Sequence, residues 1–157
     1  MPIWLFAALC VACAFLWAYT FGVQGATLFW GKRLGEGNEF LPAAGMQNAI
    51  TPPGQNTRNI LMFASLLALP ILGVHQLGWT VGLGGLVATG FAAGFISAAL
   101  PKRDSHFFFG TILRGLVNRR AKFARASDEL RVDAIDAVLE KLKDEFIVHQ
   151  AEQGRHP

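Results

Sequence analysis

Charged side chains are missing from two long stretches of this chain of 157 residues: residues 1–31 contain none, and neither do residues 59–101. Only 16% of the residues are charged, against about 25% in a typical soluble domain, while 52% are apolar. A chain this apolar has enough apolar surface to bury in a folded structure, so it is not intrinsically disordered. The uncharged stretches argue against a water-soluble globule. They favour a small membrane protein with several spans and a polar C-terminal tail.

Cysteine is scarce, which excludes a fold held together by disulfides. The two cysteines, Cys10 and Cys13, have the C-x-x-C spacing of redox pairs. Such pairs work at a helix N-terminus, whereas these two lie in the middle of an apolar run. No histidine follows Cys13, so the pattern for covalent haem attachment is also absent. We interpret both as small apolar residues of a span.

Chemical motifs are missing as well. The chain has no phosphate-binding loop, dinucleotide fingerprint or nucleophile elbow, and no two of its four histidines have metal-ligand spacing on a helix. His75, near the outer end of a predicted span, could ligate a haem or relay protons, but a hydrated interfacial histidine is the simpler interpretation. The sequence therefore predicts no catalytic, cofactor-binding or metal-binding residue.

Three apolar runs are long enough to cross a membrane, at about residues 3–25, 59–77 and 79–100. A span needs about 20 mostly apolar residues. The first run has no basic residue before it and exceeds the apolar region of a signal peptide, so we expect an uncleaved span. None of the three contains Asp, Glu, Lys or Arg, which argues against ion-coupled transport and intramembrane acid–base catalysis.

Basic residues predict the orientation of these spans. Residues 32–58 contain three and residues 102–125 contain seven, whereas the N-terminus and the predicted turn near residue 77 contain none. Basic residues beside spans favour the cytoplasmic side. With three spans both basic regions fall on that side, whereas two or four would separate them. We expect an integral protein of a bacterial inner membrane, with its N-terminus outside and its C-terminus in the cytoplasm.

Residues 102–125 predict a basic helix that lies in the membrane interface. Apolar residues fall on one broad helical face, among them Phe109 and Leu116, and basic residues lie elsewhere on the helix. The side chains expected to contact anionic lipid are Lys102, Arg103, Phe109, Arg114, Leu116, Arg119, Arg120 and Lys122. A helix packed on a partner subunit is the alternative. Nucleic acid is disfavoured, because topology already explains basic residues beside a span.

Residues 127–149 predict a cytoplasmic amphipathic helix. Ser127, Asp128 and Glu129 suit a helix start, and apolar residues then recur on one face. That face should dock on the preceding helix, a second copy or a partner. Residues 150–157 have no periodicity and are predicted to be a disordered tail.

The third span carries two faces of small residues, which let helix backbones approach closely in lipid. The residues expected in helix packing are Gly78, Gly82 and Gly85 on one face, and Gly90 and Gly94 on the other. Two such faces require two neighbours. The first two spans can supply both, but we expect one face to meet another chain.

Polar residues cluster at 47–58, where Arg58 and side-chain amides could hold a phosphate or lipid headgroup. An ordinary turn of Pro, Gly and Asn explains the composition equally well. The sequence thus predicts an all-α protein that acts as a non-catalytic accessory or scaffold subunit, binding lipids and other membrane subunits or a second copy. A small homo-oligomeric channel or passive carrier is the alternative, and an enzyme acting at residues 47–58 is the third possibility.

Overall fold

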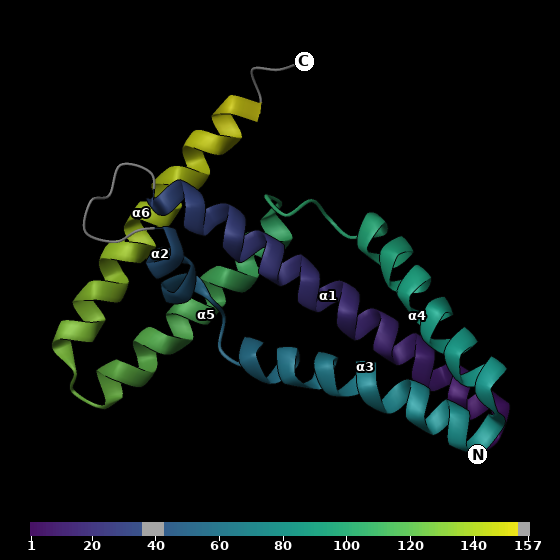
Figure 1. Ribbon diagram of the computed structural model, residues 1–157. Helices are drawn as coiled ribbons and strands as arrows, with labels where there is room; N and C mark the ends of the chain where they lie inside the picture. The colour runs from purple at the N-terminus through teal and green to yellow at the C-terminus, as the bar shows by residue number, and fades with distance from the viewer. Residues whose placement is uncertain (36–42, 154–157) are drawn as a thin grey trace. The chain divides into compact units, whose positions relative to one another are not determined.

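The computed structural model describes residues 1–35 and 43–153, which form helices and no strand (Figure 1). The helices are α1 (Ile3–Gly35), α2 (Ala43–Ile50), α3 (Gln55–Leu77), α4 (Trp79–Ala99), α5 (His106–Arg125) and α6 (Glu129–Gln153). The predicted all-α class is confirmed for these residues. In this part of the chain α1, α3 and α4 are long and apolar enough to cross a membrane.

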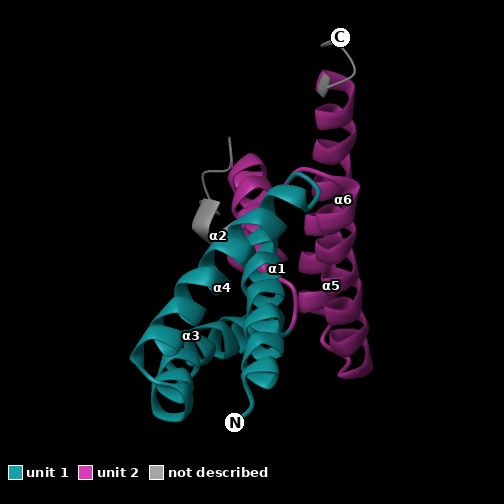
Figure 2. Ribbon diagram, turned by 90° about the vertical axis from the view of Figure 1, so that its right-hand side faces the viewer, with its two compact units in different colours: residues 1–23, 54–102 teal, residues 24–53, 103–157 magenta. Residues whose placement is uncertain are grey.

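The chain divides into two compact units, coloured separately in Figure 2. Unit 1 comprises Met1–Val23 and Gly54–Lys102, and unit 2 comprises Gln24–Pro53 and Arg103–Pro157. Helix α1 contributes residues to both. Arg58 and Lys102 are the charged residues of unit 1, which has no acidic residue. The division therefore follows the charge pattern of the sequence: one unit is almost purely apolar, and the other is rich in charges of both signs.

In unit 1, α3 and α4 pack as an antiparallel hairpin at two glycines. A Cβ atom on Gly73 would lie 2.6 Å from the Cα atom of Gly82, so the backbones touch there. Phe6 of α1 also contacts this crossing and is only 3% exposed. Further along α1, the Trp17 indole N–H donates to the Ser65 hydroxyl at 2.7 Å. An aromatic side chain thus occupies the space that the missing Cβ atoms leave.

Gly78 forms the turn of the hairpin. Its φ of 90° lies in the region that only glycine adopts without strain, and its N–H closes α3 by donating to the Val74 carbonyl. A Cβ atom at Gly78 would meet nothing within 4 Å. Gly78 was expected in both the tight turn and the helix packing, and the structure has it at the turn. The N-terminal amine of Met1 donates to the Gln76 side chain at 3.0 Å, which places the N-terminus beside this turn.

Unit 2 is built around the last turns of α1. Trp30 is fully buried, with its ring 5.6 Å from that of Phe109 in α5 and 5.6 Å from that of Phe146 in α6. Phe109 and Phe146 stack on each other with ring centres 3.8 Å apart. Fully buried aliphatic side chains complete the core: Leu34, Ile50, Ile112 and Leu142.

Several helix ends differ from the predicted bounds. Helix α1 continues to Gly35, because Lys32 and Arg33 are compatible with the last turn of a helix, where cations meet the negative end of the dipole. Helix α3 begins at Gln55, inside the stretch that was predicted to be a turn. Helix α6 runs to Gln153, so the first residues of the predicted disordered tail are helical. Residues 154–157 of that tail lie outside the described residues.

Candidate functional site

One small-residue face of α4 packs inside unit 1. Thr89 and Ala93 are buried, and the Thr89 hydroxyl donates to the Gly85 carbonyl at 2.7 Å. A Cβ atom on Gly85 would collide with the Phe6 ring, and one on Gly82 would collide with the Val74 backbone. These contacts come from α1 and α3, so this face finds its neighbours within the chain.

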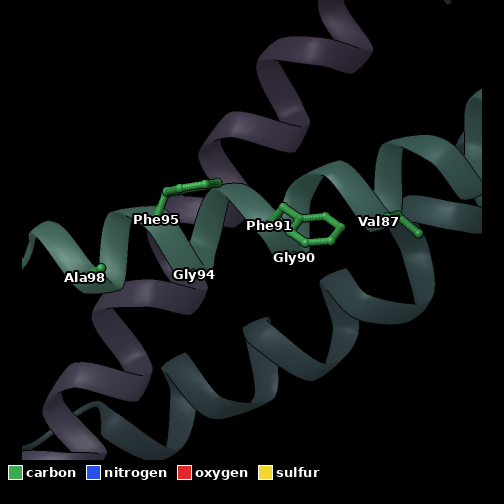
Figure 3. Close-up of a pocket in the computed structure, with 6 residues that line it drawn as sticks. All are labelled: Val87, Gly90, Phe91, Gly94, Phe95 and Ala98. Carbon is green, nitrogen blue, oxygen red and sulfur yellow. The ribbon is translucent and has the colours of Figure 1, made fainter.

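The other face of α4 is open. A Cβ atom on Gly90 or on Gly94 would meet nothing within 4 Å. A shallow apolar groove runs along this face, and Figure 3 shows the phenylalanine side chains projecting from the helix beside the two glycines. Phe91 is 68% exposed and Phe95 is 77% exposed. The groove is lined by Val87, Gly90, Phe91, Gly94, Phe95 and Ala98.

A second apolar groove of unit 1 shares the same two glycines. Trp17 and Phe21 of α1 and Met62 and Leu66 of α3 line it opposite α4. Gly90 and Gly94 therefore lie between two hollows, one on the outer face of α4 and one where the three helices meet. The surface at Gly90 and Gly94 therefore has no side chains that would keep another helix at a distance, and bulky side chains lie on both sides of it.

The apolar face of α5 is buried in unit 2. Phe109 is 9% exposed and Leu116 is 2% exposed, although both were expected to enter lipid. Their neighbours include Trp30 of α1 and the apolar face of α6, where Leu139 and Leu142 are buried. The sequence predicted that Phe109 and Leu116 are covered, but a helical face has the same pattern whether lipid or protein covers it.

Two predicted lipid-contacting cations make protein contacts instead. The Arg119 guanidinium donates to the carbonyls of Ala49 and Thr51, each at 2.7 Å, and so holds the end of α2 against α5. Arg120 forms a two-point ion pair with Asp136 of α6. Lys102, Arg114 and Lys122 are exposed, and Arg103 extends along Gly25.

The exposed residues of α5 that were not among the predicted contacts include Phe107, Val117 and Arg125. Phe107 is 50% exposed, Val117 is 49% exposed, and Arg125 is also on the surface. Phe107 could have been recognised from its angular position, because it lies on the same face as Arg114 and Arg125 at 100° per residue.

An ion-pair network fixes α6 to the end of α1 within unit 2. Arg33 lies 3.1 Å from Glu152 and 3.4 Å from Glu145, and its Nη1 atom lies 3.2 Å from Nδ1 of His149. Nε2 of His149 lies 3.0 Å from a carboxylate oxygen of Asp104. Because a guanidinium only donates, Nδ1 of His149 accepts from Arg33 and Nε2 donates to Asp104. The network is a structural clamp that joins three segments.

The polar cluster at 47–58 is divided between the two units. In unit 1, Arg58 donates twice to the side-chain oxygen Oε1 of Gln55, and Nε2 of Gln55 donates to the Thr20 backbone carbonyl at 3.4 Å. Gln55 is only 2% exposed. In unit 2, Arg119 binds the carbonyls of this stretch. Within each unit these polar groups hold neighbouring segments together.

The remaining candidate residues stay apart. Cys10 and Cys13 are free and half-buried in α1, and His75 is exposed near the hairpin turn. No three His, Cys, Asp or Glu side chains come together as a possible metal site in the part of the chain that the structure describes. Comparisons with family models, with curated proteins and with solved structures find no match to this chain.

Proposed function

We propose that this protein is a non-catalytic accessory or scaffold subunit of a larger membrane assembly, and that α4 binds a transmembrane helix of another subunit. The observation that carries the proposal is the open groove at Gly90 and Gly94. By its basic residues we assign the protein to a bacterial inner membrane, with the C-terminus in the cytoplasm.

Glycine inside a helix is unfavourable by roughly 0.5–1 kcal/mol relative to alanine, so it calls for a packing reason. At Gly82 and Gly85 the reason is internal, because α3 and Phe6 occupy the space. At Gly90 and Gly94 no described atom of the chain uses the space. In lipid, close backbone contact is a main source of helix association, and a partner helix at Gly90 and Gly94 would supply it.

The rest of unit 1 supports a binding role over a chemical one. Its helical segments contain no Asp, Glu, Lys or Arg apart from Arg58, which is engaged with Gln55 at the start of α3, and His75 is exposed near the hairpin turn. Intramembrane acid–base chemistry needs a positioned titratable group. Unit 1 instead presents a surface for binding: the open groove with Gly90 and Gly94 at its base and aromatic side chains beside them.

The test is recovery of the assembly from native membranes in mild detergent. Gly90→Leu and Gly94→Leu, tested singly, should each reduce the co-purifying chains strongly, because the bulky side chain separates backbones at a cost of about 1–3 kcal/mol by analogy with overpacked cores. The amount of inserted protein should not fall, since leucine is favoured over glycine in lipid.

Ala88→Leu is the matched control. Ala88 is also small and exposed on α4, but it does not line the groove. It should assemble like the parent protein. Assembly of the glycine variants at the parent level would refute the proposal. Recovery of a single chain type as a homo-oligomer with vesicle conductance would instead favour the channel.

A further inference from the structure

We propose that the outward face of α5 binds the anionic phospholipid surface of the membrane. We call this face the basic stripe. It is a different face of the helix from the apolar one, which the sequence indicated as the face that enters lipid. It consists of Phe107, Arg114, Val117, Asn118, Lys122 and Arg125. The inference does not depend on the proposed partner of α4, because it concerns a different unit and a different ligand.

The stripe is the uncovered side of the helix. At 100° per residue, Phe107, Arg114, Asn118 and Arg125 fall within about 40° of one another, with Val117 and Lys122 at the flanks. The opposite side contains Phe108, Ile112 and Leu116, which are buried. Lys122, Asn118 and Arg125 also line a shallow hollow with two alanines.

Charge complementarity identifies the partner. Helix α5 contains no acidic residue, and Arg119 and Arg120 are already engaged by carbonyls and by Asp136. The three cations of the stripe, Arg114, Lys122 and Arg125, therefore face outward without a counter-charge on their own helix. A leaflet of anionic lipid presents the opposite charge over a wide surface.

The two apolar members of the stripe distinguish a membrane from other polyanions. Phe107 and Val117 are about half exposed, and both could enter the boundary between headgroups and acyl chains while long cationic side chains reach the phosphates. Valine offers no flat ring for stacking nucleic-acid bases. A bilayer therefore accounts for both kinds of residue in the stripe.

Chain connectivity limits how far the start of α5 can lie from the end of α4. Helix α4 ends at Ala99 and α5 begins at His106. Seven residue steps span at most about 25 Å even when fully extended. The first residue of α5 therefore lies no farther than that from the end of a predicted span.

The experiment uses the full chain with one nitroxide label at position 117, introduced as Val117→Cys in a Cys10→Ala, Cys13→Ala background. The protein is placed in nanodiscs of phosphatidylcholine alone or with added phosphatidylglycerol. Accessibility of the label to oxygen, which partitions into lipid, is measured against that to a water-soluble nickel chelate. We expect the ratio to rise several-fold with the anionic lipid, and to fall back at about 1 M salt, where the Debye length is roughly 3 Å.

Variants show whether the stripe itself is responsible. Replacing Arg114, Lys122 and Arg125 with Gln should abolish the rise. The matched control replaces Arg120, Arg131 and Lys143 with Gln, which removes the same charge elsewhere and should retain the rise. Circular dichroism establishes that both proteins keep their helical content.

Three outcomes would overturn the proposal. The first is an equal ratio in neutral and anionic nanodiscs. The second is an equal loss in both triple variants, which would assign the effect to net charge. The third is an accessibility ratio that does not change with anionic lipid, together with a label that becomes protected when single-stranded RNA is added. That result would make the stripe a nucleic-acid surface.

Discussion

Three arginines on α5 have different surroundings within unit 2. Arg114 is exposed, Arg119 donates to two backbone carbonyls, and Arg120 pairs with Asp136. All three look alike in the sequence, because each is a cation on an amphipathic helix. The partners of Arg119 and Arg120 come from segments distant in sequence, near residue 50 and in α6. Only the folded structure therefore shows which arginine has a structural role and which is available to a ligand.

The Arg120–Asp136 pair makes a pH-dependent contribution to stability. The hydrogen bond from Arg120 holds the pKa of the Asp136 carboxyl below its ordinary value of about 3.9. A carboxyl with a lowered folded-state pKa stabilises the fold above the unfolded pKa, and this contribution is lost as pH falls through the folded pKa. Both side chains are 44% exposed, so the effect on stability should be small.

The measurement is an NMR titration of the Asp136 side-chain carboxyl in the full-length protein. Its midpoint should lie below that of an ordinary aspartate, and Arg120→Gln should move the midpoint upward. Arg114→Gln removes the same charge from an exposed position and should change it little. A midpoint that does not respond to Arg120→Gln would mean that the ion pair is absent in solution.

Helix α4 shows how far sequence reasoning reaches at the scale of an element. The spacing of small residues predicted two faces, and the structure has both, one packed and one open. The spacing could not tell which neighbour each face meets, because Phe6 and Gly73 are distant in sequence. For α5 the covered face was recognised but assigned to lipid, since the pattern of Phe109 and Leu116 does not record what covers them.

The stability of the α3–α4 crossing should change when a single methyl group is added to one of its glycines. In Gly82→Ala the added Cβ atom would collide with the Val74 backbone, which cannot move aside like a flexible side chain, at a cost of about 1–3 kcal/mol. In Gly84→Ala the methyl group meets nothing within 4 Å, and the better helix propensity of alanine should leave the protein as stable or stabilise it by up to about 1 kcal/mol.

Thermal unfolding of both variants in the same detergent provides the comparison. Gly82→Ala should unfold at a lower temperature than the parent, and Gly84→Ala at an equal or higher one. Equal unfolding temperatures for the two variants would mean that the backbones do not touch at Gly82.

At the scale of the whole molecule, the charge pattern and the contacts of unit 1 agree. Because α3 and α4 form a hairpin, Arg58 near the start of α3 and Lys102 after the end of α4 belong to the same end of it. The N-terminal amine lies at the other end, beside Gln76 near the turn. Both charged residues of unit 1 are thus at one end, and the chain leaves for unit 2 from that end after Val23 and Lys102.

This arrangement predicts a fixed orientation in the membrane. Basic residues beside spans favour the cytoplasmic side, so the end with Arg58 and Lys102 should be cytoplasmic and the Gly78 turn external. Reporter fusions to truncated chains test this: a fusion after residue 103 should be active only with a cytoplasmic reporter, and one after residue 78 only with an external reporter. Replacing Lys102 and Arg103 with Gln in the fusion after residue 103 should weaken this preference. Two fusions that report the same side would contradict the three-span arrangement, and an inverted pair would move unit 2, with all 11 acidic residues, to the outside.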